Sequence, residues 1–298
     1  MNTHNCQSRS NGLWMMAALT IVLLIPSAKA YAEPRSAAPT GIIGAFDEEV
    51  RLIEQAMDTQ KTERLMGVPF IVGRLRGQPV VVAETGVGKV NAAMTTTLLI
   101  DHYHPAEIVF TGIAGGLNPK LAPGDIVIGA KLIQHDLGEY ATNGFKADGV
   151  NSPVDGKKNP VAFPADPGLV QVVEQASRVT PFASPDGDKA TRKPSVLTGT
   201  IVTGDSFIAS PAKSRELHQQ FNADVVEMEG AAVAQICYQA KVPFVVIRSV
   251  SDNADEHANR DLARFYKTAA ENSANLVLKV MESLAARENQ HAAPVEHR

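Results

Sequence analysis

The sequence predicts an α/β fold in which short buried strands alternate with helices. The run VPFVVI at residues 242–247 is continuously apolar, which is typical of a strand covered on both faces, as in a parallel sheet. The runs GIIGA at 41–45 and EIVF at 107–110 are similar, and helical patterns lie between them. In such sheets, ligands bind outside the carboxyl ends of the strands.

A polar segment follows the strand at 242–247 directly. It contains Arg248, Ser251 and Asp252. One interpretation is that these side chains form the edge of a binding site, and the other is a solvated loop whose aspartate caps the next helix. The abrupt change from apolar to charged residues favours a binding site.

The N-terminus has the pattern of a secretory signal peptide. Arg9 supplies a positive charge, residues 13–25 are apolar, and small residues follow, so that cleavage is expected after Ala30 or Ala32. The apolar run is too short for a membrane-spanning helix. We therefore expect residues 1–30 to be removed and the protein to be periplasmic or secreted, with no membrane attachment afterwards.

Charge and cysteine content exclude several classes of function. The net charge of −4 becomes −6 when residues 1–30 are removed, because Arg9 and Lys29 are lost and no acid is lost. A mildly acidic protein is a poor candidate for binding nucleic acid. Cys237 is then the only cysteine, so that no internal disulfide can form, and it falls in an apolar helical pattern that indicates core packing. The histidines show no metal-ligand spacing, and we expect neither a metal nor a cofactor.

The remaining patterns predict one domain over residues 41–286. We expect strands at 41–45, 70–75, 79–84, 107–110, 124–133, 195–202, 224–229 and 242–247. We expect helices at 47–57, 91–103, 166–179, 213–221, 231–240 and 261–286. Residues 31–40 are expected to be flexible and 287–298 disordered, whereas 138–167 is expected to be a surface excursion that acts as a lid or subunit contact.

Two segments near strand ends have more than one interpretation. The acids at 47–49 suit a helix N-terminus, and they also bring a carboxylate to the ligand-binding edge. The segment TGVGK at 85–89 is not a phosphate-binding loop, because Val90 stands where serine or threonine would hold magnesium. Its two glycines still offer backbone N–H groups to a ligand.

Three further segments carry candidate site residues. The glycine-rich TGIAGG at 111–116 permits close approach of a sugar or base. Phe207 follows a polar turn, where it could stack on a planar ligand or pack in the core. Glu227 and Glu229 alternate along the expected strand and would face the same side, so that one could meet the ligand while the other anchors the loop.

These motifs together resemble the 5′-methylthioadenosine/S-adenosylhomocysteine nucleosidases of the nucleoside phosphorylase superfamily. The resemblance rests on GIIGAFDEEV, TGIAGG, TGDSFI, VEMEG and RSVSDNAD in this order, and it extends from Gly41 to about Val280. It implies a three-layer α/β/α domain with a mixed central sheet, a homodimer, and a small nucleoside as substrate.

The resemblance also implies a role for each site residue. Asp252 would protonate N7 of the leaving adenine, Glu49 would orient and deprotonate the attacking water, and Glu229 would bind the ribose hydroxyls. Substrate contacts are implied for Met228 against the sugar, Phe207 on the base, the backbone of Ile208 at the adenine edge, Arg248 and Ser251 at the catalytic loop, and Phe46, Ile113, Ala114, Gly115 and Leu262. Ile113 and Leu262 depart from the residues that are common in the family, and 138–167 is longer than usual.

The segment after the first strand favours a hydrolase over a phosphorylase. Superfamily phosphorylases resemble one another in having Gly-Asp-Pro-x-x-Arg there, whereas this chain has GAFDEE at 44–49. A carboxylate repels phosphate and suits a water nucleophile. We therefore expect hydrolysis of the N-glycosidic bond of a purine nucleoside, with methylthioadenosine or S-adenosylhomocysteine as the expected substrate. The alternatives are a phosphate-dependent phosphorylase and a non-catalytic, secreted nucleoside-binding or storage protein.

Overall fold

The computed structural model describes residues 38–142, 144–185 and 192–292. The chain divides into two units, 1–36 and 37–298, and every described residue lies in the second unit. The predicted signal peptide and its cleavage sites therefore lie outside the described residues. None of the helices in the described part is long and apolar enough to cross a membrane.

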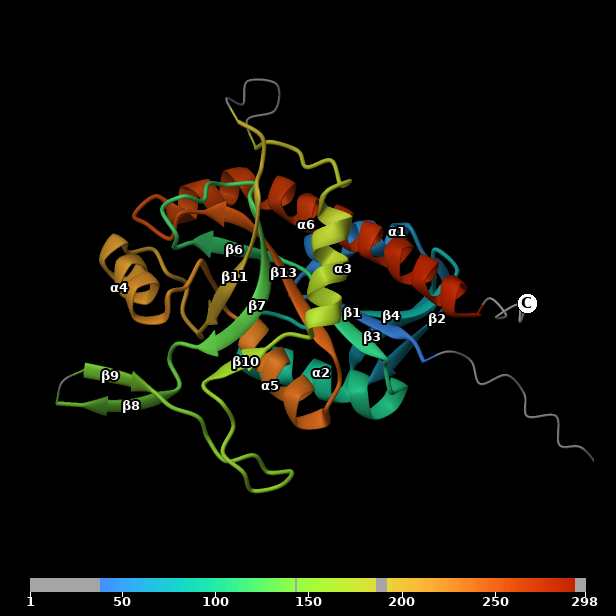
Figure 1. Ribbon diagram of the computed structural model, residues 1–298, viewed down its shortest axis with the longest axis horizontal. Helices are drawn as coiled ribbons and strands as arrows, with labels where there is room; N and C mark the ends of the chain where they lie inside the picture. The colour runs from blue at the N-terminus through green and yellow to red at the C-terminus, as the bar shows by residue number, and fades with distance from the viewer. Residues whose placement is uncertain (1–37, 143, 186–191, 293–298) are drawn as a thin grey trace, which may run out of the picture. The chain divides into compact units, whose positions relative to one another are not determined.

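A mixed sheet of eleven strands runs through the domain in the order β10-β7-β11-β12-β6-β13-β5-β1-β4-β3-β2 (Figure 1). The strands are β1 Thr40–Gly44, β2 Asp58–Leu65, β3 Val68–Leu75, β4 Gln78–Glu84, β5 Glu107–Phe110, β6 Ile113–Gly116, β7 Ile126–Gln134, β10 Ala162–Pro164, β11 Val196–Thr203, β12 Val225–Glu227 and β13 Phe244–Asp252. Strand β1 is parallel to β4 and β5, whereas β12 is antiparallel to β6. The predicted mixed sheet is confirmed.

Helices cover both faces of this sheet. They are α1 Asp47–Gln55, α2 Lys89–Tyr103, α3 Pro167–Ser177, α4 Pro211–Phe221, α5 Gly230–Ala240 and α6 Ala258–Ala292. Helices α1, α3 and α6 pack on one face, and α2 and α5 pack on the other (Figure 1). Successive side chains of β1 point to opposite faces, so that Ile42 packs with α1 and α6 while Ile43 packs with α2 and α5. The three-layer α/β/α prediction is confirmed.

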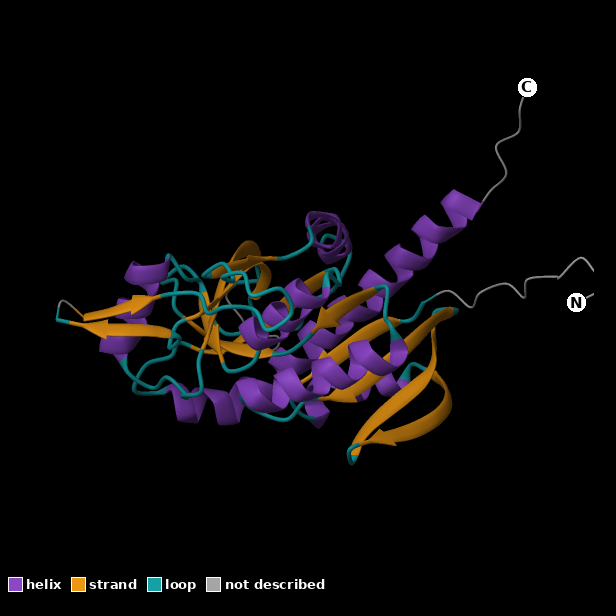
Figure 2. Cartoon of the chain, turned by 90° about the horizontal axis from the view of Figure 1, so that it is seen from below, coloured by secondary structure: helices purple, strands orange, loops and turns teal. Residues whose placement is uncertain are grey.

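The excursion at 138–167 contains strands that the sequence did not predict. Strands β8 Gly138–Ala141 and β9 Gly144–Ala147 form a separate antiparallel pair. Both views show this hairpin at one end of the domain, away from the main sheet (Figure 2). Strand β10 then returns to the sheet and pairs with β7.

Two predicted element boundaries near the site were wrong. Strand β13 does not end at residue 247 but continues to Asp252, because its polar half pairs with β6 on one side and with β7 on the other. Strand β12 ends at Glu227, and Glu229 precedes α5 with φ −136° and ψ −41°, so that the two glutamates do not share a strand face.

Two other differences lie farther from the site. The polar sequence DTQKTERL at 58–65 forms the edge strand β2, which has no apolar alternation that could predict it. Helix α6 continues to Ala292, whereas the sequence analysis ended it near residue 286. The residues beyond 286 include Ala, Arg, Glu and Gln, which propagate a helix readily. Residues 293–298 lie outside the described part.

Candidate active site

A cavity of about 190 Å³ lies where several strands of the main sheet end. Its walls come from the ends of β1, β6, β12 and β13, from the segment after β11 and from the start of α6. The lining residues are Phe46, Glu49, Val87, Ile113, Ala114, Gly115, Phe207, Val226, Glu227, Met228, Glu229, Ser251, Asp252 and Leu262. Two larger hollows of about 400 and 430 Å³ lie elsewhere, but neither gathers buried acids.

Most of the predicted site residues therefore lie together. The exceptions are Arg248, which is buried beneath the cavity, and Ile208, which packs against a small apolar cluster behind Phe207. Phe207 is 45% exposed, so it lies at the mouth of the cavity and not in the core.

Glu49 is buried at the inner wall, on the first turn of α1. Its Oε2 accepts a hydrogen bond from the backbone N–H of Ala45 at 2.5 Å, and its Oε1 accepts one from Ile113 at 3.0 Å. Gly112 allows this approach, because a Cβ there would lie 2.7 Å from Glu49 Oε1. Burial raises the pKa of Glu49 to about 7, and the charge of Arg248 and the backbone donors limit the rise. The carboxyl group can thus exchange a proton near neutral pH.

Glu229 faces the cavity from the start of α5. Its Oε1 accepts a hydrogen bond from the N–H of Gly88 at 2.9 Å. This N–H of the segment 85–89 therefore binds a carboxylate of the protein and not a ligand. Gly88 has φ +95°, a conformation that glycine adopts without strain. Burial, followed by the neighbouring charge of Glu227, raises the pKa of Glu229 to about 8.

Asp252 ends β13 and lines the cavity from there. The register between β13 and β6 shifts between Val250 and Asp252, and this bulge redirects the side chains at the end of the strand. Oδ2 of Asp252 accepts a hydrogen bond from Ser251 Oγ at 2.7 Å, and Oδ1 accepts one from Ala254 N–H at 2.8 Å. Burial raises the pKa of Asp252, although these two hydrogen bonds oppose the change.

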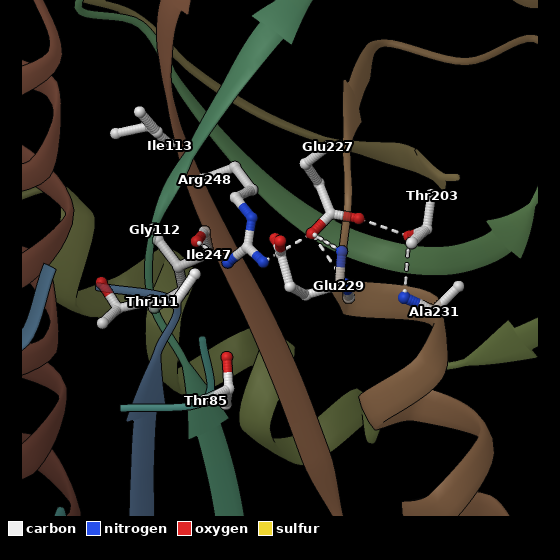
Figure 3. A network of polar contacts seen from close by, with 12 residues as sticks. Thr85, Thr111, Gly112, Ile113, Thr203, Glu227, Glu229, Ala231, Ile247 and Arg248 are labelled. Atoms are coloured by element: carbon white, nitrogen blue, oxygen red, sulfur yellow. Dashed lines mark hydrogen bonds and ion pairs between the residues drawn. The ribbon is translucent and has the colours of Figure 1, made fainter. Parts of the chain in front are cut away.

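Arg248 forms a buried ion pair with Glu227, which lines the cavity (Figure 3). Arg248 Nη2 lies 2.6 Å from Glu227 Oε2, and the two side chains are only 1% and 3% exposed. Glu227 also accepts hydrogen bonds from Thr203 Oγ1 and from the N–H groups of Glu229 and Gly230. Glu227 thus anchors the segment that carries Glu229, which was one of the two roles that the sequence left open.

The cavity therefore combines acids and apolar walls, and the buried cation Arg248 is paired with one of these acids. In the described part of the chain, no three His, Cys, Asp or Glu side chains are arranged to hold a metal ion. Carboxyl groups with raised pKa values that line one cavity are suited to acid–base chemistry near neutral pH.

Comparison with known proteins identifies the family. A sequence model of the phosphorylase superfamily matches residues 39–282. The chain belongs to this superfamily. It is 38% identical over 244 residues to a 5′-methylthioadenosine/S-adenosylhomocysteine nucleosidase of Bacillus thuringiensis, covering 82% of this chain and 98% of the relative. The predicted family resemblance is confirmed.

Solved structures of the superfamily lead to the same assignment. The nucleosidase of Neisseria meningitidis, solved with methylthio-immucillin-A, has a TM-score of 0.71 and 34% identity over 83% of this chain and 99% of that one. The futalosine hydrolase of Helicobacter pylori has a TM-score of 0.70 and 28% identity over 83% of this chain and 98% of that one. The first of these proteins is named a nucleosidase and the second a hydrolase.

The sequence analysis missed Val87 and Val226 as lining residues, and it left open which of Glu227 and Glu229 anchors the loop. Val87 lies in the segment between Gly86 and Gly88, which was considered only for its backbone N–H groups. The two glutamates at 227 and 229 indicated that one carboxylate anchors the loop. They could not show that Glu227 pairs with Arg248, because Arg248 lies on β13, which is distant in the sequence.

Proposed function

We propose that the protein hydrolyses the N-glycosidic bond of a purine nucleoside. The proposal rests on one observation: Glu49, Glu229 and Asp252, far apart in the sequence, line the same cavity with raised pKa values. Cleavage of this bond passes through a state with positive charge on the sugar and negative charge on the departing base. It therefore needs a proton donor at the base and carboxylates near the sugar.

Each acid has one role in the proposed reaction. Asp252 transfers its proton to N7 of the base while the bond between C1′ and N9 breaks. Water bonds to C1′ and gives a proton to Glu49. Glu229 accepts hydrogen bonds from the ribose hydroxyls. The products are the free base and a free sugar.

The pKa values support these roles. A general base works best when its pKa lies near the working pH, and the pKa of Glu49 is about 7. Burial raises the pKa of Asp252, which favours the protonated form that a general acid requires. Asp252 and Glu49 line the same cavity, so that both can act on one bound nucleoside.

The lining of the cavity favours water over phosphate as the nucleophile. Its ionisable side chains are all acids, and no lysine or arginine is among its lining residues. The nearby guanidinium, that of Arg248, is already paired with Glu227. A phosphate ion, or a nucleotide with a 5′-phosphate, would meet carboxylates and no counter-charge.

We infer that the substrate is methylthioadenosine or S-adenosylhomocysteine. The names of the relatives in Bacillus and Neisseria support this choice, and so do the apolar side chains of Phe46, Val87 and Leu262 in the cavity. A neutral 5′ substituent would lose its contact with water there at little cost.

We also propose that the protein is an exported homodimer. The pattern of residues 1–30 supports export. Large apolar side chains that remain exposed support association: Val90 is 78% and Met94 38% exposed on α2, and Tyr140 is 84% exposed on β8. Size measurement in solution and the location of the protein in fractionated cells test these two statements.

The activity is tested by following free base during incubation with methylthioadenosine, S-adenosylhomocysteine, adenosine and inosine in phosphate-free buffer. We expect base release from at least one adenine nucleoside, and its loss in the Asp252→Asn variant. Release only after phosphate is added would indicate a phosphorylase. Nucleoside binding with no base release would indicate a binding or storage protein.

A further inference from the structure

The segment 204–210, between β11 and α4, carries Phe207 at the mouth of the cavity. It forms neither helix nor strand, so side-chain contacts have a large share in holding it. Asp205, two residues before Phe207, joins this segment to Lys89 at the start of α2 and to Asp136 after β7. We call Lys89, Asp136 and Asp205 the clasp.

The clasp is a closed ring of three interactions. The N–H of Lys89 donates to Asp205 Oδ1 at 2.8 Å, and the N–H of Asp205 donates to Asp136 Oδ2 at 3.0 Å. Lys89 Nζ closes the ring at 2.6 Å from Asp136 Oδ1. Every member contacts the other two, so that removal of the Lys89 ammonium group leaves Asp136 with one of its two partners in the ring.

The position of Lys89 is unfavourable without these partners. It is the first residue of α2, whose first turn has no acid and no side-chain cap. A positive charge at a helix N-terminus opposes the helix dipole. Asp205 provides the missing carboxylate from another segment, and Asp136 neutralises the ammonium group.

The same helix start also reaches Glu229. Gly88, directly before Lys89, donates its N–H to Glu229 Oε1 at 2.9 Å. The adjacent N–H groups of Gly88 and Lys89 therefore bind a cavity carboxylate and the segment that carries Phe207. A shift at the start of α2 would displace both sides of the cavity.

The clasp is also shielded more than an ordinary surface pair. The side chains of Lys89 and Asp136 are 17% and 33% exposed. Burial alone would raise the pKa of Asp136, but the hydrogen bonds from Lys89 and Asp205 and the charge of Lys89 outweigh it and keep this pKa below its usual range. The carboxylate of Asp136 therefore stays ionised in the neutral pH range and keeps its contact with Lys89.

We propose that the clasp positions Phe207 for contact with the purine base and couples that contact to the placement of Glu229. This inference rests on the proposed function and deepens it, because it makes three residues outside the cavity determinants of base affinity. They are positioning residues, since none of them lines the cavity.

The test compares Lys89→Met with Lys279→Met in the full chain. Lys279 pairs with Glu282 at 2.8 Å on α6, with side chains 38% and 37% exposed, and it provides a matched loss of one lysine ion pair away from the cavity. We expect Lys89→Met to weaken adenine binding in calorimetry about tenfold, as the loss of a base–aromatic contact would. Lys279→Met should leave adenine affinity unchanged.

A double-mutant cycle separates positioning from general damage to the fold. In the Phe207→Ala background, Lys89→Met should have almost no further effect on adenine affinity, because the clasp acts through Phe207. Equal effects in both backgrounds, or an unchanged affinity in the single variant, would overturn the proposal.

Hydrogen exchange without ligand distinguishes failure of the clasp from failure of the proposed function. We expect faster amide exchange at 204–210 and at Gly88 in Lys89→Met than in Lys279→Met. If the wild-type protein released no base from any nucleoside, the proposed function would fail, and hydrogen exchange alone would then test whether the clasp holds this segment. Unchanged exchange at these amides would refute it.

Discussion

Replacement of Arg248 by methionine tests whether the buried ion pair between Arg248 and Glu227 stabilises the folded domain. Arg248 and Glu227 are almost fully buried and 2.6 Å apart, so the substitution leaves a buried carboxylate without its cation. Removal of one partner of such a pair costs about 3–5 kcal/mol. Glu227 keeps its hydrogen bonds from Thr203 and Gly230, which favours the lower end, about 3 kcal/mol.

Urea denaturation at pH 7 measures this loss directly. Methionine retains a favourable contact with the ring of Phe110, over which the guanidinium carbon lies at 4.1 Å, so that the lost charge dominates the result. For a domain of this size, ~3 kcal/mol corresponds to a fall in Tm of roughly 6–12 °C.

The matched variant is Arg248→Met combined with Glu227→Gln. Without a buried charge, much of the lost stability should return, because replacing both partners of a buried pair by neutral groups is often nearly neutral. A single variant within about 1 kcal/mol of wild type, or a double variant as unstable as the single one, would refute this account of the pair.

Three further predictions concern the acids themselves. Asp252→Asn should lower kcat at least ~10²-fold, because asparagine cannot transfer a proton to the base. The fold should stay intact, because the asparagine oxygen can still accept the hydrogen bond from Ala254 N–H. Steady-state kinetics and a melting curve check these two expectations. The value of kcat/KM should fall as pH decreases through about 7, because Glu49 takes up a proton there and can no longer act as a base. A pH–rate profile without this fall would contradict the role of Glu49. The free energy of unfolding should decrease as pH rises from about 4.5 toward 8, because the raised pKa of Glu229 means that the folded state binds this proton more tightly than the unfolded state. In the Glu229→Gln variant, the free energy of unfolding should depend less on pH over this range.

Most of the fold could be predicted because its strands are buried on both faces. The runs at 107–110 and 242–247 have no polar residue in their interiors, and each became part of the central sheet. Strand β2 could not be predicted, because its side chains face solvent along most of its length and only its pairing with β3 keeps it extended.

The members of the site could be predicted better than their contacts. Glu49, Glu229 and Asp252 each follow or end a strand, so the edge at which they meet follows from the topology. Whether a given side chain lines the cavity or lies beneath it depends on local geometry. Asp252 lines the cavity and Arg248 does not, because β13 is long and has a bulge near its end. The residue pattern predicts neither the length of this strand nor its bulge.

The identity of the sugar product tests the central claim most directly. The protein is incubated with methylthioadenosine and an excess of inorganic phosphate, and the sugar is then identified by phosphorus NMR and a reducing-sugar assay. We predict a free reducing sugar and no phosphorus signal other than that of inorganic phosphate. Accumulation of a sugar 1-phosphate would show that phosphate, and not water activated by Glu49, attacks the ribosyl carbon.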